Sequence, residues 1–236
     1  MAELNDLVER YSDDPIQREP VRKELTRVEG LLRQRGEAAI QDLATRLPAL
    51  TDSKLQSRLL VNVVGQIDSA SAQQLALDAF HNRKLLSGVR LVGANVAMKT
   101  HKDEIVGELV RLLDGKDDSF DRREDVAQFF KSTPDPRAAE ALCRIAKNAE
   151  EPRILRRFVL QALGSYKQPE VIDTLKDVTS QEIHGELRAE ALHSLNDALG
   201  RGVLEFLAFL KPKLNVDDPL RKLVIGYEDY WNKQPQ

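Results

Sequence analysis

The residues of this chain that could do acid–base, nucleophilic or metal chemistry are few and stand far apart in the sequence. The histidines are His81, His101, His184 and His193, and none has another histidine four residues away. The single cysteine, Cys143, has no second thiol to join it in a disulfide or a zinc site. This set predicts no metal centre and no nucleophile–histidine pair, because both need several such groups at defined spacings.

Two other patterns of residues could bind ions or phosphate. Asp117, Asp118 and Asp121 follow a glycine, but the closing glutamate of a calcium loop is missing. No glycine-rich loop of the phosphate-cradling type occurs. We interpret the aspartates as a solvated loop and Cys143 as a structural thiol on an apolar helix face. The sequence therefore predicts a protein that is not an enzyme, with no catalytic, cofactor-binding or metal-binding residue and no cofactor.

An arginine recurs about once every 33 residues, each time at the start of an apolar helical run. It stands at Arg22, Arg58, Arg90, Arg123, Arg157, Arg188 and Arg221. Two interpretations stay open. A ladder of cations along a groove could bind a polyanion, or each side chain could pack between helices and bond a nearby carboxylate or helix end. We favour the second, because acidic residues are abundant nearby.

These arginines divide the chain into pairs of helical segments. Apolar residues follow each arginine at the spacing of one helical face, and a loop then leads to a second apolar segment. We expect the second segments at 37–50, 69–80, 102–113, 135–149, 168–179 and 200–214. Pro20 and Pro136 mark helix starts, whereas Pro48 and Pro212 fall late in helical runs and should kink or end them. No segment alternates with period two, so we expect no strands.

A repeat of this length predicts one stacked domain over residues 1–236, in which each helix pair buries its apolar face against its neighbours. The expected parts are an N-terminal capping helix at about 3–12, repeats at about 20–214 and a C-terminal cap at about 219–233. Tyr227, Tyr230 and Trp231 in the last segment could cover the final repeat or dock a second copy. We favour the cap and expect a monomer or a weak homodimer.

The repeat units resemble those of a known family. In the segment RFVLQALGSYKQPEVIDTLKDV an arginine opens the first helix, Leu163 and Gly164 end it, Pro169 follows the turn and Leu175 lies in an apolar second helix. This pattern is similar to HEAT repeats, most closely to the short HEAT-like variety described in phycobilin lyases. The resemblance covers about residues 20–232 and implies an all-α fold. That fold would be a right-handed α-α superhelix, or HEAT-like solenoid, of about six to seven helix pairs.

The composition narrows the range of partners. The formal net charge is −3, whereas proteins that bind nucleic acid or anionic membranes usually carry a basic surplus. No apolar run approaches the roughly 20 residues that span a bilayer, and the first residues lack the basic start and apolar stretch of a signal peptide. We expect a cytoplasmic protein whose partner is neither a membrane nor nucleic acid.

The predicted function is that of a non-catalytic scaffold or adaptor that binds a partner protein on the concave face of the solenoid. The second helices would line that face, with Arg111, Arg137, Glu140, Arg144, Lys147, Asp173 and Lys176 as the partner-binding residues. Two alternatives stay open on the same fold. One is a nucleic-acid-binding protein similar to alkylpurine DNA glycosylases. The other is a bilin-lyase-type accessory protein that holds a phycobiliprotein or a bilin.

Overall fold

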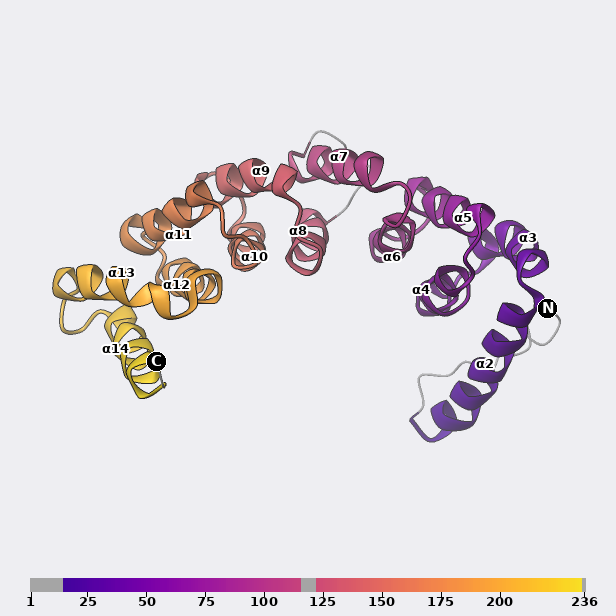
Figure 1. Cartoon of the computed structure of the whole chain (residues 1–236), viewed down its shortest axis with the longest axis horizontal. Coiled ribbons are helices and arrows are strands. Elements are labelled where there is room, and N and C mark those ends of the chain that lie inside the picture. The colour runs from indigo at the N-terminus through magenta and orange to yellow at the C-terminus, as the bar shows by residue number, and fades with distance from the viewer. Residues whose placement is uncertain (1–14, 116–121, 235–236) are drawn as a thin grey trace. The chain divides into compact units, whose positions relative to one another are not determined.

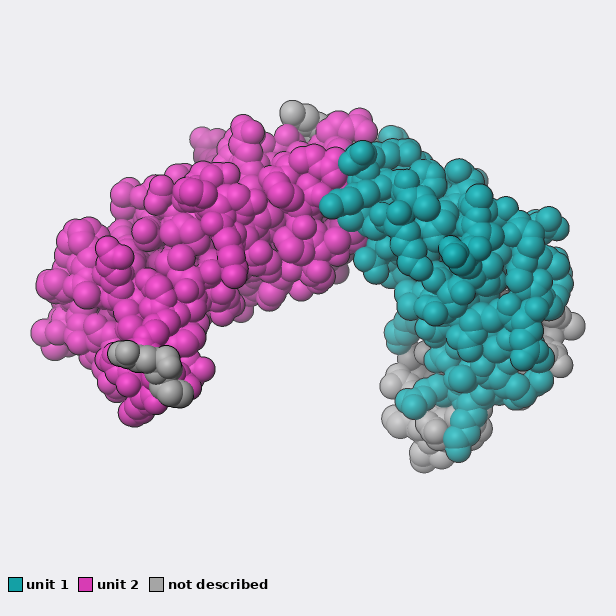
Figure 2. Space-filling view, in the orientation of Figure 1, with its two compact units in different colours: residues 1–105 teal, residues 106–236 magenta. Residues whose placement is uncertain are grey.

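The structure of the protein, a computed structural model, describes residues 15–115 and 122–234. All regular structure in these two ranges is helical, as expected. The chain divides into two compact units, unit 1 (Met1–Ile105) and unit 2 (Val106–Gln236), coloured teal and magenta in Figure 2. The expected capping helix at 3–12 and Asp117, Asp118 and Asp121 lie outside the described residues. The expectation of one domain stays a prediction.

Unit 1 begins with a long helix, which is followed by paired helices. Its elements are α2 (Pro15–Arg35), α3 (Glu37–Arg46), η1 (Leu47–Ala49), α4 (Ser53–Asn62), η2 (Val64–Gln66), α5 (Ala70–His81), α6 (Ser87–Ala97) and the start of α7 (Lys102–Leu113). The first helices α4 and α6 pack on each other, and so do the second helices α3 and α5 (Figure 1). Asp52 and Ser69 begin α4 and α5 by accepting backbone N–H bonds.

The closest helix crossing of unit 1 is between α5 and α6. A Cβ on Gly93 of α6 would lie 2.7 Å from the carbonyl oxygen of Ala76 and 3.2 Å from Cβ of Ala79 on α5. Both distances are shorter than van der Waals contact, so only glycine fits at this position. This agrees with the small residues that recur along the helical runs of the sequence.

Unit 2 continues the same alternation of first and second helices. Its elements after α7 are α8 (Arg123–Ser132), α9 (Pro136–Lys147), α10 (Arg153–Leu163), α11 (Pro169–Gln181), α12 (Gly185–Leu199), η3 (Gly200–Gly202), α13 (Val203–Leu210), η4 (Lys211–Lys213) and α14 (Pro219–Lys233). The first helices α8, α10 and α12 pack on one another in one layer, and the second helices α9 and α11 pack together in the other (Figure 1).

The helix boundaries follow the sequence closely. The observed second helices α5, α7, α9 and α11 match the expected segments to within two residues at each end. Pro48 and Pro212 each fall in a short 3-10 turn that ends a helix, as expected. One boundary was predicted wrongly: the helix expected to begin near Pro20 begins at Pro15, where an acidic residue also precedes a proline. Six pairs, from α2/α3 to α12/α13, precede α14 in the described residues.

The last helix, α14, covers the end of unit 2. It packs on α12 and α13 and buries Leu220 and Val224 against them. Nε1 of Trp231 donates a hydrogen bond of 2.7 Å to Oδ1 of Asn196, and the Tyr227 hydroxyl contacts the His193 ring. Tyr230, in contrast, is 52% exposed. Two of the three aromatic side chains of α14 therefore face α12.

None of the described helices is both long enough and apolar enough to cross a bilayer.

Candidate functional site

The recurring arginines bind the end of the preceding second helix. The last carbonyls of a helix have no partner within it, and in five repeats a guanidinium N–H donates to such a carbonyl. The bonds run from Arg90 to Phe80 (2.8 Å), Arg123 to Leu113 (2.7 Å), Arg156 to Ala146 (3.1 Å), Arg188 to Thr179 (3.0 Å) and Arg221 to Lys211 (3.3 Å). We call these five residues the capping arginines. Their positive charge also suits the negative end of the helix dipole.

The structure corrects the register of this repeat at two positions. Arg156, and not Arg157, is the capping arginine of α10, while Arg157 donates to Glu190 of α12 at 3.1 Å. In α4 the capping position is held by Gln56, whose amide donates to the carbonyls of Leu47 and Leu50, the first residue of η1 and the residue that follows it. Arg58 instead pairs with Glu29 of α2. A step of one residue turns a side chain by about 100° around the helix axis, which decides which neighbour it meets.

Three capping arginines of unit 2 also bind a carboxylate from the turn that leads into the next first helix. Arg123 pairs with Glu151 at 2.8 Å, Arg156 with Glu182, and Arg188 with Asp218 at 3.0 Å. Each guanidinium thus links its own first helix to the end of the preceding second helix and to the turn that leads into the next first helix. These contacts support the structural interpretation of the arginines, because the same N–H groups would be needed to hold a polyanion.

The pairing also shifts the pKa of two of these carboxyl groups. Burial by itself raises the pKa of Glu182, but the backbone N–H of His184 and the Arg156 guanidinium outweigh it, so the pKa lies below its ordinary value. Burial likewise acts to raise the pKa of Asp218, and the N–H of Leu220 with the Arg188 guanidinium lowers it overall. Both groups are therefore carboxylates at neutral pH.

The predicted partner-binding residues all lie on second helices. They are Arg111 on α7, Arg137, Glu140, Arg144 and Lys147 on α9, and Asp173 and Lys176 on α11. Lys176 is half-buried and the other six are exposed. The structure therefore brings them onto the two neighbouring helices α9 and α11 and onto α7. Whether a partner binds them, and whether the second helices form a concave face, stays a prediction.

Three of these residues already bind a carboxylate of the same chain. Arg137 pairs with Asp135 at 2.8 Å, Arg144 with Asp114, and Lys147 with Asp177 at 3.2 Å. Within the described residues, the side chains of the other four make no ion pair or hydrogen bond. They are Arg111, Glu140, Asp173 and Lys176. A partner could bind these four without breaking a contact in the chain.

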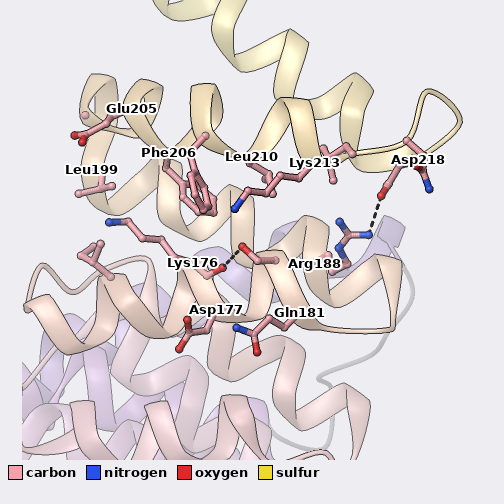
Figure 3. Close-up of a pocket in the computed structure, with 16 residues that line it drawn as sticks. Lys176, Asp177, Gln181, Arg188, Leu199, Glu205, Phe206, Leu210, Lys213 and Asp218 are labelled. Carbon is pink, nitrogen blue, oxygen red and sulfur yellow. Dashed lines mark hydrogen bonds and ion pairs between the residues drawn. The ribbon is translucent and has the colours of Figure 1, made fainter.

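A groove of about 820 Å³ opens between α11, α12 and the α13–η4 segment (Figure 3). We call it the α11–α13 groove. Its apolar lining comes from Ile172, Leu199, Phe206, Phe209, Leu210 and Leu214. The ammonium groups of Lys176 and Lys213 point into it from its two sides (Figure 3). Of these residues, only Lys176 was expected at a site from the sequence.

The sequence did contain a signal for α13, the side of this groove that we did not expect to form a site. In the α13 segment VLEFLAFL, Glu205 is the only polar residue. A helix that is apolar on all sides is normally covered on all sides, so the segment indicated either complete burial or an exposed apolar surface. The structure shows an exposed surface, because Phe209 is 55% exposed.

The histidines and the cysteine contact residues of their own and of neighbouring helices. His81 lies 3.6 Å from a Glu104 oxygen, and His101 Nδ1 lies 2.8 Å from the Thr100 hydroxyl. Burial raises the pKa of the half-buried Cys143 thiol, which keeps it protonated and a poor nucleophile. No cluster of three His, Cys, Asp or Glu side chains suited to a metal ion occurs in the ranges that the structure describes.

Comparison with known proteins agrees with this arrangement of paired helices. Residues 108–196, which run from α7 to α12, match the model of the HEAT repeat family. With the all-α packing of first and second helices, this match supports a HEAT-like repeat protein and agrees with the expected all-α solenoid class. HEAT repeats commonly mediate protein–protein interactions and are generally not catalytic. The finer resemblance to repeats of the phycobilin-lyase type stays a prediction.

No curated protein and no solved structure shows significant similarity to the chain.

Proposed function

We propose that the protein is a non-catalytic scaffold or adaptor that binds a partner protein through its second helices. The observation that carries the proposal is a repeated pair of exposed acids within the segment that matches HEAT repeats. Glu140 on α9 and Asp173 on α11 occupy the same position one repeat apart, and each is exposed and makes no ion pair with another described residue. Repeat proteins bind extended partners through such periodic contacts.

The charges around this pair favour a protein over a nucleic acid. Glu140 and Asp173 would repel phosphates, and the cations Arg137, Arg144 and Lys147 beside them are each paired with a carboxylate. Nucleic-acid binding draws most of its free energy from cations that are available to phosphates. The DNA-glycosylase-like and bilin-lyase-type alternatives have no comparable feature in the described residues and enter as outcomes of the test.

The proposal is tested by capture of binding proteins from a nuclease-treated lysate of the native host, read by quantitative mass spectrometry. The test variant carries Glu140→Arg and Asp173→Arg. The control variant carries Glu150→Arg and Asp229→Arg, which change the same charge at exposed positions outside the second helices. We expect a protein captured in stoichiometric amount by the wild type and the control, and about tenfold less of it with the test variant, equal to about 1.4 kcal/mol.

Three results would overturn the proposal. The first is equal capture by both variants. The second is loss of every bound protein on nuclease treatment, which would move the function to nucleic-acid binding and make a glycosylase assay the next step. The third is a coloured preparation with bound phycobiliprotein or bilin, which would support the accessory role of the bilin-lyase type.

A further inference from the structure

The α13 helix has an apolar side that the rest of unit 2 leaves uncovered. Seven of its eight residues are apolar, and one face of them is buried in unit 2. Phe209 is on the other side and is 55% exposed, with its ring 6.2 Å from that of Phe206. Exposed aromatic rings next to a concave apolar lining mark binding sites in soluble proteins.

The uncovered side of α13 faces a gap in the layer of second helices. Two pairs of consecutive second helices in the described residues pack directly on each other, α3 on α5 and α9 on α11. Between α11 and α13 the contact is sparse, and the α11–α13 groove takes its place (Figure 3). A helix is the element that packs in this layer, so a helix of another molecule fits the gap by the same side-chain packing.

The charges of the groove indicate what that helix would carry. Lys176 makes no ion pair with another described residue, and Lys213 is held with its ammonium 3.3 Å from the centre of the Phe209 ring. Two of the groove's acids are already paired, Asp177 with Lys147 and Asp218 with Arg188. The third, Glu205, lies at one end of the groove, beside Leu199 (Figure 3). Among the described residues, the lining charges without an ion pair are therefore two lysines and one glutamate, which leaves a net positive charge beside the apolar floor.

We propose that the α11–α13 groove binds an acidic amphipathic helix of a partner protein. The helix would set apolar side chains against Phe206 and Phe209 and carboxylates against Lys176 and Lys213. Along α11 the lining residues Ile172, Lys176 and Ser180 stand one turn apart, which spans about 12 Å and corresponds to about two turns of a bound helix. This inference rests on the proposed function and specifies the partner's chemistry.

The test uses the full chain and two synthetic peptides of about 15 residues that are long enough to form a helix. Both carry leucine at the same positions along one face. One has glutamate and the other lysine at the flanking positions. Binding is followed by the fluorescence anisotropy of a dye at the peptide terminus. We expect saturable binding of the glutamate peptide that weakens as salt is added, and no saturable binding of the lysine peptide.

Three variants locate the binding. Lys176→Glu with Lys213→Glu should lower the affinity for the glutamate peptide by about tenfold or more and allow the lysine peptide to bind. Phe209→Ser should lower the affinity for the glutamate peptide without creating affinity for the lysine peptide. Lys222→Glu with Lys233→Glu changes the same charge on exposed positions of α14 and should leave binding as in the wild type. Circular dichroism melting of each variant verifies that unit 2 is folded.

The inference is overturned if the glutamate peptide does not bind saturably, if both peptides bind equally, or if the two groove lysines can be reversed without effect. It is also overturned if the wild type dimerises and Phe209→Ser makes it a monomer, because the occupant is then a second copy of the chain. Glu140 and Asp173 do not line the groove. If the peptides do not bind but the Glu140/Asp173 variant still captures less partner than the wild type, only this inference is overturned. If the peptides do not bind and that variant captures as much partner as the wild type, the proposed function is overturned as well.

Discussion

Three of the capping arginines, Arg123, Arg156 and Arg188, perform two tasks that a lysine could not combine. The Nε of each donates to the end of the preceding second helix, and a terminal nitrogen reaches sideways to a carboxylate in the next turn, as Arg123 does with Leu113 and Glu151. The planar guanidinium has donors fixed in both directions, whereas an ammonium is a single charged point. The repeated arginine is therefore explained by the junction between repeats, without a ligand.

The capping role of Arg156 is tested by comparing its replacement by methionine with the same replacement of its sequence neighbour Arg157. The Arg156 side chain is 3% exposed and binds both Ala146 and Glu182, so Arg156→Met leaves a buried carbonyl and a carboxylate without their partner. We expect the free energy of unfolding, measured with urea, to fall by about 3–5 kcal/mol. Arg157→Met removes an exposed pair with Glu190 and should cost about 1 kcal/mol or less. Equal losses for the two variants would contradict the corrected register.

The Arg156–Glu182 pair should also make the free energy of unfolding depend on pH. The pKa of Glu182 is lower in the folded chain than its ordinary value of 4.5. The pair therefore stabilises the fold above that value, and the contribution is lost as the pH falls through the folded pKa. We expect Glu182→Gln to lower the unfolding free energy at neutral pH and the difference from wild type to shrink as the pH falls below 4.5.

The matched control is Glu186→Gln, which changes an exposed carboxylate that makes no ion pair with another described residue. Its free energy of unfolding should equal that of the wild type at every pH. A difference between Glu182→Gln and wild type that stays constant from neutral to acidic pH would show that the carboxylate contributes nothing through its charge.

At the level of elements, close helix crossings depend on single glycines. The α5–α6 crossing brings the backbone of Ala76 and Phe80 against Gly93, where a Cβ would lie 2.7 Å from an oxygen and 3.0 Å from a nitrogen. Gly164 at the end of α10 meets Ser194 of α12 in a similar way, with 3.2 Å between the added Cβ and a Cα atom. The helices can approach this closely because these positions have no side chain.

Two glycines of the same helix, α6, offer a direct comparison. Gly93→Ala should lower the unfolding free energy by about 1–3 kcal/mol, because α5 must shift to admit the methyl group. Gly88→Ala has open space around the added Cβ and should be neutral or stabilise by about 0.4–1 kcal/mol through the unfolded state. Thermal and urea unfolding of the two variants measure the difference. Similar effects at both positions would argue against the close crossing.

The elements could be predicted from the sequence because their signals are local. The spacing of apolar residues gave the limits of α7 to the residue, and Pro212 marked the end of α13. The capping role of Arg156 was missed, since Arg157 beside it is the same residue type and only the position of the preceding helix distinguishes them. The α11–α13 groove was missed for a related reason. It depends on how η3 and the left-handed Gly200 (φ 55°) turn the chain into α13.

At the scale of the whole molecule, stability should be distributed among the repeats. In a solenoid each helix pair contacts only its neighbours, so the total is approximately a sum of repeat and interface contributions. The capping arginines follow the same rule, because each joins only neighbouring repeats. A change at one junction should therefore loosen the adjoining repeats first.

Hydrogen exchange read by mass spectrometry can detect this locality in Arg156→Met. We expect faster exchange of backbone amides in α8, α10 and α12, which pack on one another around the altered junction. The amides of α4 and α6 in unit 1 should keep the protection that they have in the wild type. Arg157→Met serves as the control and should change exchange little in either unit. A parallel rise in exchange across both units would mean that the chain unfolds as one cooperative body, and the description of its stability as a sum of neighbouring repeats would have to be abandoned.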